Sequence, residues 1–281
     1  PVQALTPEAI SAARYTPKPV KTETYAPDRA PARADVFKLA PESQVAPRAT
    51  APTRPSGGGA EVVKPAPAAH KGKLVVIDPG HGGSDPGAVH KTADGQTDIT
   101  EEDVTLAVAQ KLAEMLRADG YDVQLTRTAD SDVAQGASKA ADLQARVDIA
   151  NEAGADVFVS VHFNGLDNPS TRGTEVWYCS QRPHGAENEK LATAVQESLV
   201  RSLDEAGFEA VDRGIKDDVR MGHFALTGPR IARPSQMPAI IGEALFITND
   251  QDTAILKGPE GQEALARGYF QGIKAYFGDA N

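Results

Sequence analysis

From Lys73 onward, short apolar runs alternate with amphipathic stretches, and this alternation leaves few architectures open to the chain. The apolar runs predict strands over 74–78, 122–127, 156–163, 174–178 and 239–247. Apolar residues spaced three and four apart predict helices over 101–119, 140–153, 186–206 and 259–277. Strands that alternate with helices predict an α/β fold: a mainly parallel, twisted sheet with helices on both faces.

The first 72 residues have a different composition. Twelve of the 20 prolines lie before Lys71, together with many alanines and the run Ser56-Gly57-Gly58-Gly59. No period of 2 or 3.6 residues is sustained there, and such a segment buries too little apolar surface to fold alone. We therefore expect residues 1–72 to be an extended Pro/Ala-rich linker or tail, and residues 73–281 to form the folded domain.

Charge is distributed unevenly between these two parts. The chain has a net charge of −10, which argues against nucleic acid as its main partner. Residues 1–73 hold 11 basic and 6 acidic side chains, so they carry about +5 and the remainder about −15. Opposite charges on one chain favour weak docking, so we expect the tail to lie extended over an acidic surface of the domain.

Cys179 is the only cysteine, which excludes an internal disulfide and a cysteine-rich zinc site. No apolar run approaches the roughly 20 residues that span a bilayer. The opening residues, PVQALTPEAI, lack the basic and apolar regions of a signal peptide. We interpret the chain as a mature or trimmed protein from which the targeting segment has been removed.

Four residues stand out as candidates for chemistry. His81 lies in the glycine-rich turn after the first strand (VVIDPGHGGSDPG), and His162 lies near the end of the strand DVFVSVHF. Taken alone, His81 is as readily a turn residue and His162 a core histidine, while the helix dipole explains Glu101 in a first turn. Glu243 interrupts the buried run AIIGEALFI, where an unpaired carboxylate would cost several kcal/mol, so it must meet a cation, a metal or a catalytic task. Two histidines and a carboxylate suit a zinc site with one open position.

A family resemblance rests on six blocks in order. They are VVIDPGHGGSDPGA, TEEDVTLAVAQKLAEML, GYDVQLTRTAD, ARVDIANEAGADVFVSVHFN, DRGIK and MPAIIGEALFITN. With them, the chain from about Leu74 to Phe277 resembles the zinc-dependent N-acetylmuramoyl-L-alanine amidases often called amidase-3. The resemblance implies that His81, Glu101 and His162 bind Zn²⁺ and that Glu243 is catalytic.

The resemblance also implies what the protein does and where. A zinc-activated water would hydrolyse the amide bond between N-acetylmuramic acid and L-alanine in peptidoglycan, for cell-wall remodelling or cell separation. The location would be extracytoplasmic, in the periplasm, in the cell envelope or secreted. Peptidoglycan is then the main partner, and residues 1–72 are expected to meet an envelope or activator partner, or to act as a spacer beside anionic wall polymers.

Several other residues carry secondary expectations. Phe163 and Leu245 depart from the family pattern, and we expect them to narrow or reshape the groove near the metal. Asp78 and Asp85 flank the His81 turn, where they orient the ring or cap the turn. Arg127 and Arg146 fit structural ion pairs as well as substrate contacts. We assign no ligand role to the remaining histidines, His70, His90, His184 and His223.

Two other functions remain open from the residues alone. One is a related zinc hydrolase, such as a peptidase or deacetylase, and the other is a non-catalytic peptidoglycan-binding module. Retention of all the ligand types and of Glu243 speaks against the second. The only spare length before Glu243, residues 221–237, reads as a loop, so we expect an open site without a helical plug.

Overall fold

A six-stranded sheet runs through the folded part of the chain, which the computed structural model describes for residues 71–218 and 231–279. Its strand order is β4-β1-β5-β8-β6-β7. The strands are β1 Leu74–Pro79, β4 Asp122–Leu125, β5 Val157–Asn164, β6 Thr174–Tyr178, β7 Asp212–Asp217 and β8 Ala239–Phe246. Neighbouring strands are parallel except for β6 and β8, which are antiparallel. The predicted α/β fold with a mainly parallel sheet is confirmed.

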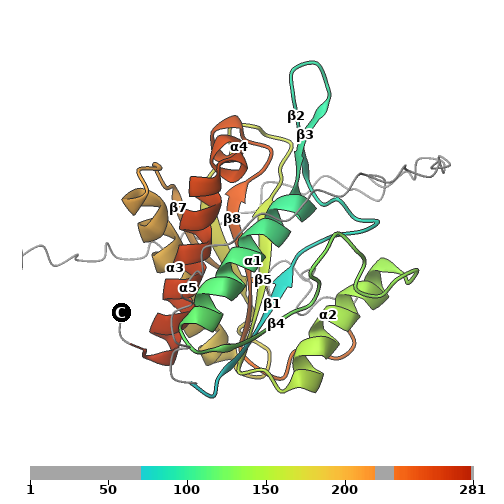
Figure 1. Ribbon diagram of the computed structural model, residues 1–281, viewed down its shortest axis with the longest axis vertical. Coiled ribbons are helices and arrows are strands. Elements are labelled where there is room, and N and C mark those ends of the chain that lie inside the picture. The colour runs from blue at the N-terminus through green and yellow to red at the C-terminus, as the bar shows by residue number, and fades with distance from the viewer. Residues whose placement is uncertain (1–70, 219–230, 280–281) are drawn as a thin grey trace, which may run out of the picture. The chain divides into compact units, whose positions relative to one another are not determined.

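Helices cover both faces of this sheet (Figure 1). They are α1 Glu101–Ala118, α2 Lys139–Ala153, α3 Gly185–Glu205, α4 Asp250–Lys257 and α5 Pro259–Phe277. On one face, α1, α3 and α5 pack over the larger apolar core, which includes Leu112, Leu199 and Tyr269. On the other face, α2 packs through Val147 and Ala150 over a smaller core. His162 and Glu243 project from this second face, beyond the part that α2 covers.

Local sequence accounts for these elements. In α1 the residues Val104, Val108, Leu112 and Leu116 repeat every four positions and are all buried, so one stripe of the helix faces the sheet. Burial of one such leucine stabilises the fold by roughly 1.5–3 kcal/mol. Helix α2 ends at Gly154, which adopts the left-handed conformation that glycine allows at a helix end.

Four elements, β2 Val89–Lys91, β3 Thr97–Thr100, β7 and α4, were not predicted from the sequence. The hairpin of β2 and β3 is short and polar, so it lacks a strand pattern. Strand β7 is built from the mostly polar residues DRGIKD, which no apolar run marks. Helix α4 is only eight residues long and depends on its cap, since the Asn249 side chain accepts hydrogen bonds from the backbone nitrogens of Gln251 and Asp252.

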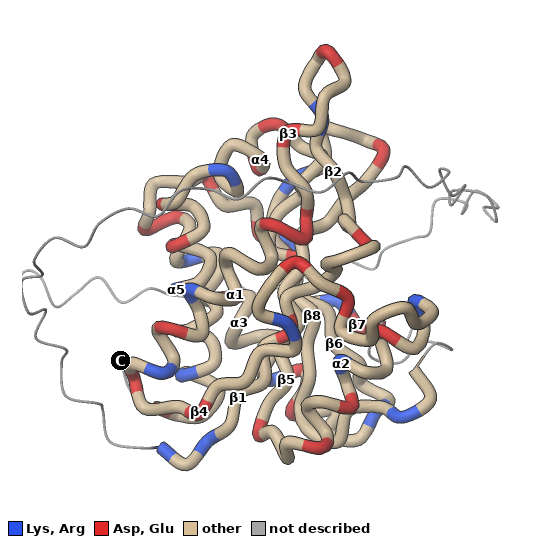
Figure 2. The backbone as a smooth tube through the Cα atoms, turned by 45° about the vertical axis from the view of Figure 1, so that its right-hand side comes forward, with Lys and Arg blue, Asp and Glu red and all other residues tan. Residues whose placement is uncertain are grey.

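The predictions for the tail concern residues that are not described, because residues 1–70 and 219–230 lie outside the described parts of the chain. The same holds for His70, His223 and most of the stretch expected to be an open loop. Lys71 is already tied to the domain: its backbone nitrogen donates to Gly120 and its Nζ to Asp119 and Asp279. Acidic residues occur at both ends of the sheet and on the β2–β3 hairpin (Figure 2). None of the described helices has the length and hydropathy needed to cross a membrane.

Candidate metal centre

Three side chains from separate elements meet at the carboxyl ends of β1 and β5. His81 follows β1, His162 lies near the end of β5, and Glu101 is the first residue of α1. Nε2 of His81 lies 3.1 Å from Oε1 of Glu101, and Nδ1 of His162 lies 3.0 Å from the same oxygen. The two ring nitrogens are 3.2 Å apart. The structure therefore brings together the three residues that the sequence singled out as a ligand set.

This triangle of atoms fits a small metal ion. A tetrahedral zinc ion with ligands at about 2.0–2.1 Å keeps its ligand atoms about 3.3 Å apart, close to the three separations in the structure. Two imidazole nitrogens and one carboxylate oxygen are also the donor types that zinc binds, and three donors leave a fourth position open. The geometry and the donor chemistry both match such an ion.

Glycines make room for these side chains. A Cβ atom on Gly80 would lie 2.3 Å from the His162 ring, and one on Gly87 would lie 2.6 Å from Oε2 of Glu101. His81 itself has φ 61°, a left-handed conformation that costs a residue with a side chain roughly 1–2 kcal/mol. The glycine-rich turn thus lets the backbone pass close to the ligands and turns the His81 ring toward them.

Two buried arginines hold this strained turn. Arg146 donates to the carbonyl oxygens of Pro79 and His81, and Arg127 donates to those of Pro79 and Gly80. Both guanidinium groups bond to backbone oxygens of the protein itself, so we assign these arginines a structural role and not a substrate contact. A turn fixed by four charge-assisted hydrogen bonds can keep an unfavourable backbone conformation.

Asp78 anchors this arrangement from inside the sheet. It accepts hydrogen bonds from Thr126, Ser160 and Arg146. Burial alone would raise the pKa of Asp78, but the Arg146 charge and the two hydroxyl donors outweigh it and hold the pKa below its usual range. Asp78 therefore acts through Arg146 on the turn, whereas Asp85 is the residue beside the ring, with Oδ2 3.0 Å from Nδ1 of His81.

Glu101 is oriented by the backbone. Its Oε2 accepts from the nitrogen of Ala88 at 2.8 Å and its Oε1 from the nitrogen of Phe163 at 3.1 Å. Burial would raise the pKa of Glu101, but the two imidazoles more than compensate and lower it. Burial would likewise lower the pKa of His81, yet Asp85 and Glu101 raise it to about 9 in the absence of a metal. A metal ion must therefore compete with protons for this site.

Glu243 lies next to the ligands on the sheet. It is paired with His162 in the register of β5 and β8, so both side chains project from the same face. Among the residues that the structure describes, its Oε2 is buried without a hydrogen-bond partner. Burial, followed by the neighbouring charges of Glu101 and Glu175, raises the pKa of Glu243 well above the usual range. A carboxylate with a free oxygen and a raised pKa is suited to accept and release a proton.

The sequence analysis missed Glu175, which lies on the other side of Glu243. Glu175 is paired with Glu243 in the register of β6 and β8 and is 4% exposed. It accepts hydrogen bonds from Asn164, Trp177 and Arg213. The sequence signal that could have identified Glu175 is the same as for Glu243: a glutamate within a predicted, mostly apolar strand.

Phe163 and Leu245 neither narrow nor reshape the groove beside the metal centre, and that expectation was wrong. Both are 1% exposed and pack in the larger core, on the opposite face of the sheet from His162 and Glu243. The physical reason is the two-residue period of a strand, which points neighbouring residues to opposite faces.

The remaining histidines that the structure describes lie outside the ligand cluster. His90 is held between Asp98 and Asp250, at 2.9 and 3.0 Å. His184 precedes α3, and its Nε2 lies 2.9 Å from the carbonyl oxygen of Gln236. Neither meets the geometry of a metal ligand.

A second group of potential ligands in the described residues is Cys179, Asp217 and Asp218. It is a poor metal site, because burial and the hydrogen bond to Asp218 raise the pKa of the Cys179 thiol to about 11. A metal ion would have to displace this proton, because metals bind the thiolate.

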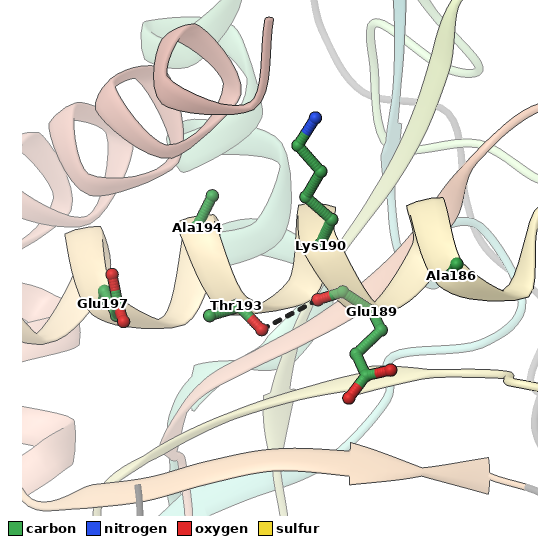
Figure 3. Close-up of a pocket in the computed structure, with 6 residues that line it drawn as sticks. All are labelled: Ala186, Glu189, Lys190, Thr193, Ala194 and Glu197. Atoms are coloured by element: carbon green, nitrogen blue, oxygen red, sulfur yellow. Dashed lines mark hydrogen bonds between the residues drawn. The ribbon is translucent and has the colours of Figure 1, made fainter. Parts of the chain in front are cut away.

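A shallow hollow on the surface of α3 lies apart from both clusters (Figure 3). Its lining side chains all come from one helix, and Thr193 donates to the backbone oxygen of Glu189 within that helix. The hollow contains none of the candidate catalytic or ligand residues.

Comparison with known proteins adds an independent line of evidence. Residues 75–275 match a protein-family model described as N-acetylmuramoyl-L-alanine amidase. A germination-specific N-acetylmuramoyl-L-alanine amidase of Bacillus subtilis is 30% identical over 212 residues, which cover 73% of this chain and 80% of that protein. The match therefore spans the domain and leaves the Pro-rich segment outside.

Solved structures agree with this result. The N-acetylmuramoyl-L-alanine amidase AmiC2 of Nostoc punctiforme is 32% identical with a TM-score of 0.59, over 73% of this chain and 97% of that one. The CwlD amidase of Clostridioides difficile, solved in complex with the GerS lipoprotein, is 26% identical with a TM-score of 0.61, over 74% of this chain and 100% of that one.

Proposed function

The chain belongs to the N-acetylmuramoyl-L-alanine amidase family, and on that premise we propose that His81, Glu101 and His162 bind a catalytic zinc ion beside a proton-transferring Glu243. The protein is a hydrolase that cleaves the amide bond between N-acetylmuramic acid and L-alanine in peptidoglycan. The observation that carries the zinc proposal is the triangle of two imidazole nitrogens and one carboxylate oxygen, 3.0–3.2 Å apart.

A zinc ion held there supplies a Lewis acid for the scissile carbonyl and lowers the pKa of a bound water to about 7. The chain's own residues supply the rest. Asp85 lies beside Nδ1 of His81 and keeps the opposite nitrogen, Nε2, turned toward Glu101 and His162. The backbone nitrogens of Ala88 and Phe163 fix the Glu101 carboxylate in the same way.

Glu243 is the proposed proton carrier. It takes a proton from the attacking water and delivers it to the nitrogen of L-alanine as the amide bond breaks, which lets the stem peptide leave as an amine. Of the two glutamates next to each other on β6 and β8, Glu243 has the buried oxygen without a partner, whereas Glu175 accepts three hydrogen bonds. Glu175 is therefore unsuited to the role.

The substrate sets the location. Because peptidoglycan lies outside the cytoplasmic membrane, we propose that the enzyme works in the periplasm, in the cell envelope or as a secreted protein. The Pro-rich residues 1–72 are proposed to be a tail without its own core that meets an envelope component or an activator. A partner of that kind has a counterpart in the amidase that was solved with a lipoprotein.

Digestion of purified peptidoglycan by the metal-loaded protein tests the proposed reaction. We expect intact stem peptides with a free L-alanine amino terminus, together with glycan strands whose lactyl groups end in a carboxylate, both identified by mass. A deacetylase would release acetate and leave the stems attached, and a peptidase would release shortened peptides. Either of those product sets would refute the assigned bond.

A further inference from the structure

We propose that Arg213 binds a free carboxylate of the substrate's stem peptide and makes the enzyme selective for stems that are not amidated. This inference deepens the proposed function and rests on it. It starts from the polar side chains that lie on the sheet beside Glu243.

Four side chains from neighbouring strands form a row across the sheet. In the strand order they are His162 on β5, Glu243 on β8, Glu175 on β6 and Arg213 on β7. His162 is paired with Glu243 and Glu243 with Glu175, so these side chains share one face. Nε of Arg213 donates to Oε2 of Glu175 at 2.8 Å and continues the row.

A bulge in β7 aims Arg213 at this row. Thr174 is paired with Asp212 and Val176 with Ile215, so the single residue Glu175 faces both Arg213 and Gly214. Gly214 has φ 71°, a conformation that glycine adopts readily. Bulges of this kind re-aim a side chain and often lie next to active sites.

The guanidinium of Arg213 is held on one side and open on the other. Nε of the guanidinium donates a hydrogen bond to Glu175. The guanidinium carbon lies over the Phe246 ring, 4.9 Å from the ring centroid. Within residues 71–218 and 231–279, the two terminal nitrogens make no hydrogen bond in the structure, and the side chain is 33% exposed. A fixed fork with two free N–H edges matches a carboxylate, which it binds through paired charge-assisted hydrogen bonds.

The surroundings explain why an arginine is needed there. Glu243 and Glu175 lie between the metal centre and Arg213, so Arg213 is the cation at this end of the row. Glu175 is itself satisfied by Asn164 and Trp177 at 2.8 and 3.1 Å, in addition to Arg213. It acts as a positioning residue that holds the arginine by one nitrogen.

Direction along the row identifies which part of the substrate Arg213 meets. Glu243 protonates the leaving nitrogen, and this nitrogen belongs to the peptide, so the peptide leads away from the metal past Glu243. Strand β7 lies two strand spacings beyond β8, about 10 Å. An extended peptide covers that distance in about three residues. The proposed ligand is therefore a carboxylate within the first three residues of the stem.

Two soluble muropeptides test this proposal, one with its stem carboxylates free and one with the same groups as carboxamides. For the wild-type holoenzyme we expect kcat/KM to favour the free acid by about tenfold to a hundredfold, the range that hydrogen bonds to charged groups provide. Arg213→Gln should raise KM for the acid, leave the amide substrate nearly unchanged, and bring the ratio close to one. Arg213→Lys keeps the charge and loses the fork, so its ratio should fall between the two.

The ratio is taken within one preparation, so partial loss of folded enzyme cancels. Arg233→Gln is the matched control, because this exposed arginine pairs with Asp148 away from the row, and its ratio should stay at the wild-type value. A wild-type ratio near one, or an unchanged ratio in both Arg213 variants, would overturn the proposal and leave the amidase function intact. Failure of the wild type to cleave either muropeptide would instead contradict the function.

Discussion

At the scale of single residues, the buried carboxylates beside the metal centre differ in how many hydrogen bonds they accept. Asp78, Glu101 and Glu175 each accept several hydrogen bonds, while Glu243 keeps one buried oxygen without a partner in the described structure. Because an unpaired carboxylate costs several kcal/mol to bury, its retention indicates a task for that oxygen. The hydrogen-bonded carboxylates therefore hold the site in place, and Glu243 is the carboxylate free to react.

Asp78 provides a stability prediction at this scale. Its folded pKa lies below the unfolded value of about 3.9, so its contribution is present above that value and is lost as the pH falls through the folded pKa. Asp78→Asn removes one of the two carboxylates that pair with the buried Arg146, the other being Asp142, and we expect a loss of about 3 kcal/mol of unfolding free energy at pH 7. The loss should shrink as the pH falls below about 4.

Denaturant unfolding at pH 7 and pH 3 measures both effects. Asp148→Asn serves as the control, because Asp148 pairs with the exposed Arg233, and surface pairs contribute about 0–1 kcal/mol. Equal losses for the two variants at pH 7 would show that the Asp78–Arg146 pair does not hold the turn.

At the scale of elements, the glycine-rich turn after β1 converts an apolar strand into a ligand-bearing loop. The turn succeeds because Gly80 and Gly87 leave space for the side chains that meet there. Arg127 and Arg146 donate hydrogen bonds to the carbonyl oxygens of the turn, from Pro79 to His81. The turn is therefore as much a part of the metal centre as the ligands themselves.

Gly80→Ala should damage the metal centre more than the fold. The added Cβ would lie 2.3 Å from the His162 ring, so the ring must move and metal affinity should fall at least tenfold. Gly258→Ala is the matched control, since its Cβ would have no atom nearer than 3.6 Å. Titration of the apoproteins with zinc compares the two, and equal affinities would contradict the packing argument.

Much of the element order could be predicted, and the exceptions have physical reasons. The bounds of β1, α1 and α5 follow from apolar runs and periodic stripes, which are local signals. The β2–β3 hairpin is short and polar, and the polar strand β7 depends on β6, a partner distant in the sequence, so no local apolar pattern marks either. For the same reason the pairing of Glu175 with Glu243, and the β7 bulge that aims Arg213, needed the sheet register to be found.

At the scale of the whole molecule, the reaction is carried by the domain, and the Pro-rich segment stays a prediction. Residues 1–73 carry about +5 and the rest about −15, which favours weak, salt-sensitive docking of the segment. The family match begins at residue 75, so none of the shared chemistry falls in the segment.

Removal of the segment tests this division of labour. A chain that begins at Pro67 keeps the Lys71 contacts and should match the full chain in melting temperature and in activity on small muropeptides. Binding to intact peptidoglycan should change, and the difference should vanish near 1 M salt, where the Debye length is about 3 Å. A large loss of thermal stability would show instead that the segment is an integral part of the fold.

The central claim is that one zinc ion is held by His81, Glu101 and His162 while Glu243 moves the proton. Its most direct test is the zinc content of Glu243→Gln, measured together with its turnover of a muropeptide, with His162→Ala as the contrasting variant. The account predicts about one zinc per chain and a loss of activity of about 10²–10⁴-fold for Glu243→Gln, and loss of most of the zinc for His162→Ala. Near wild-type turnover by Glu243→Gln, or full zinc retention by His162→Ala, would contradict it.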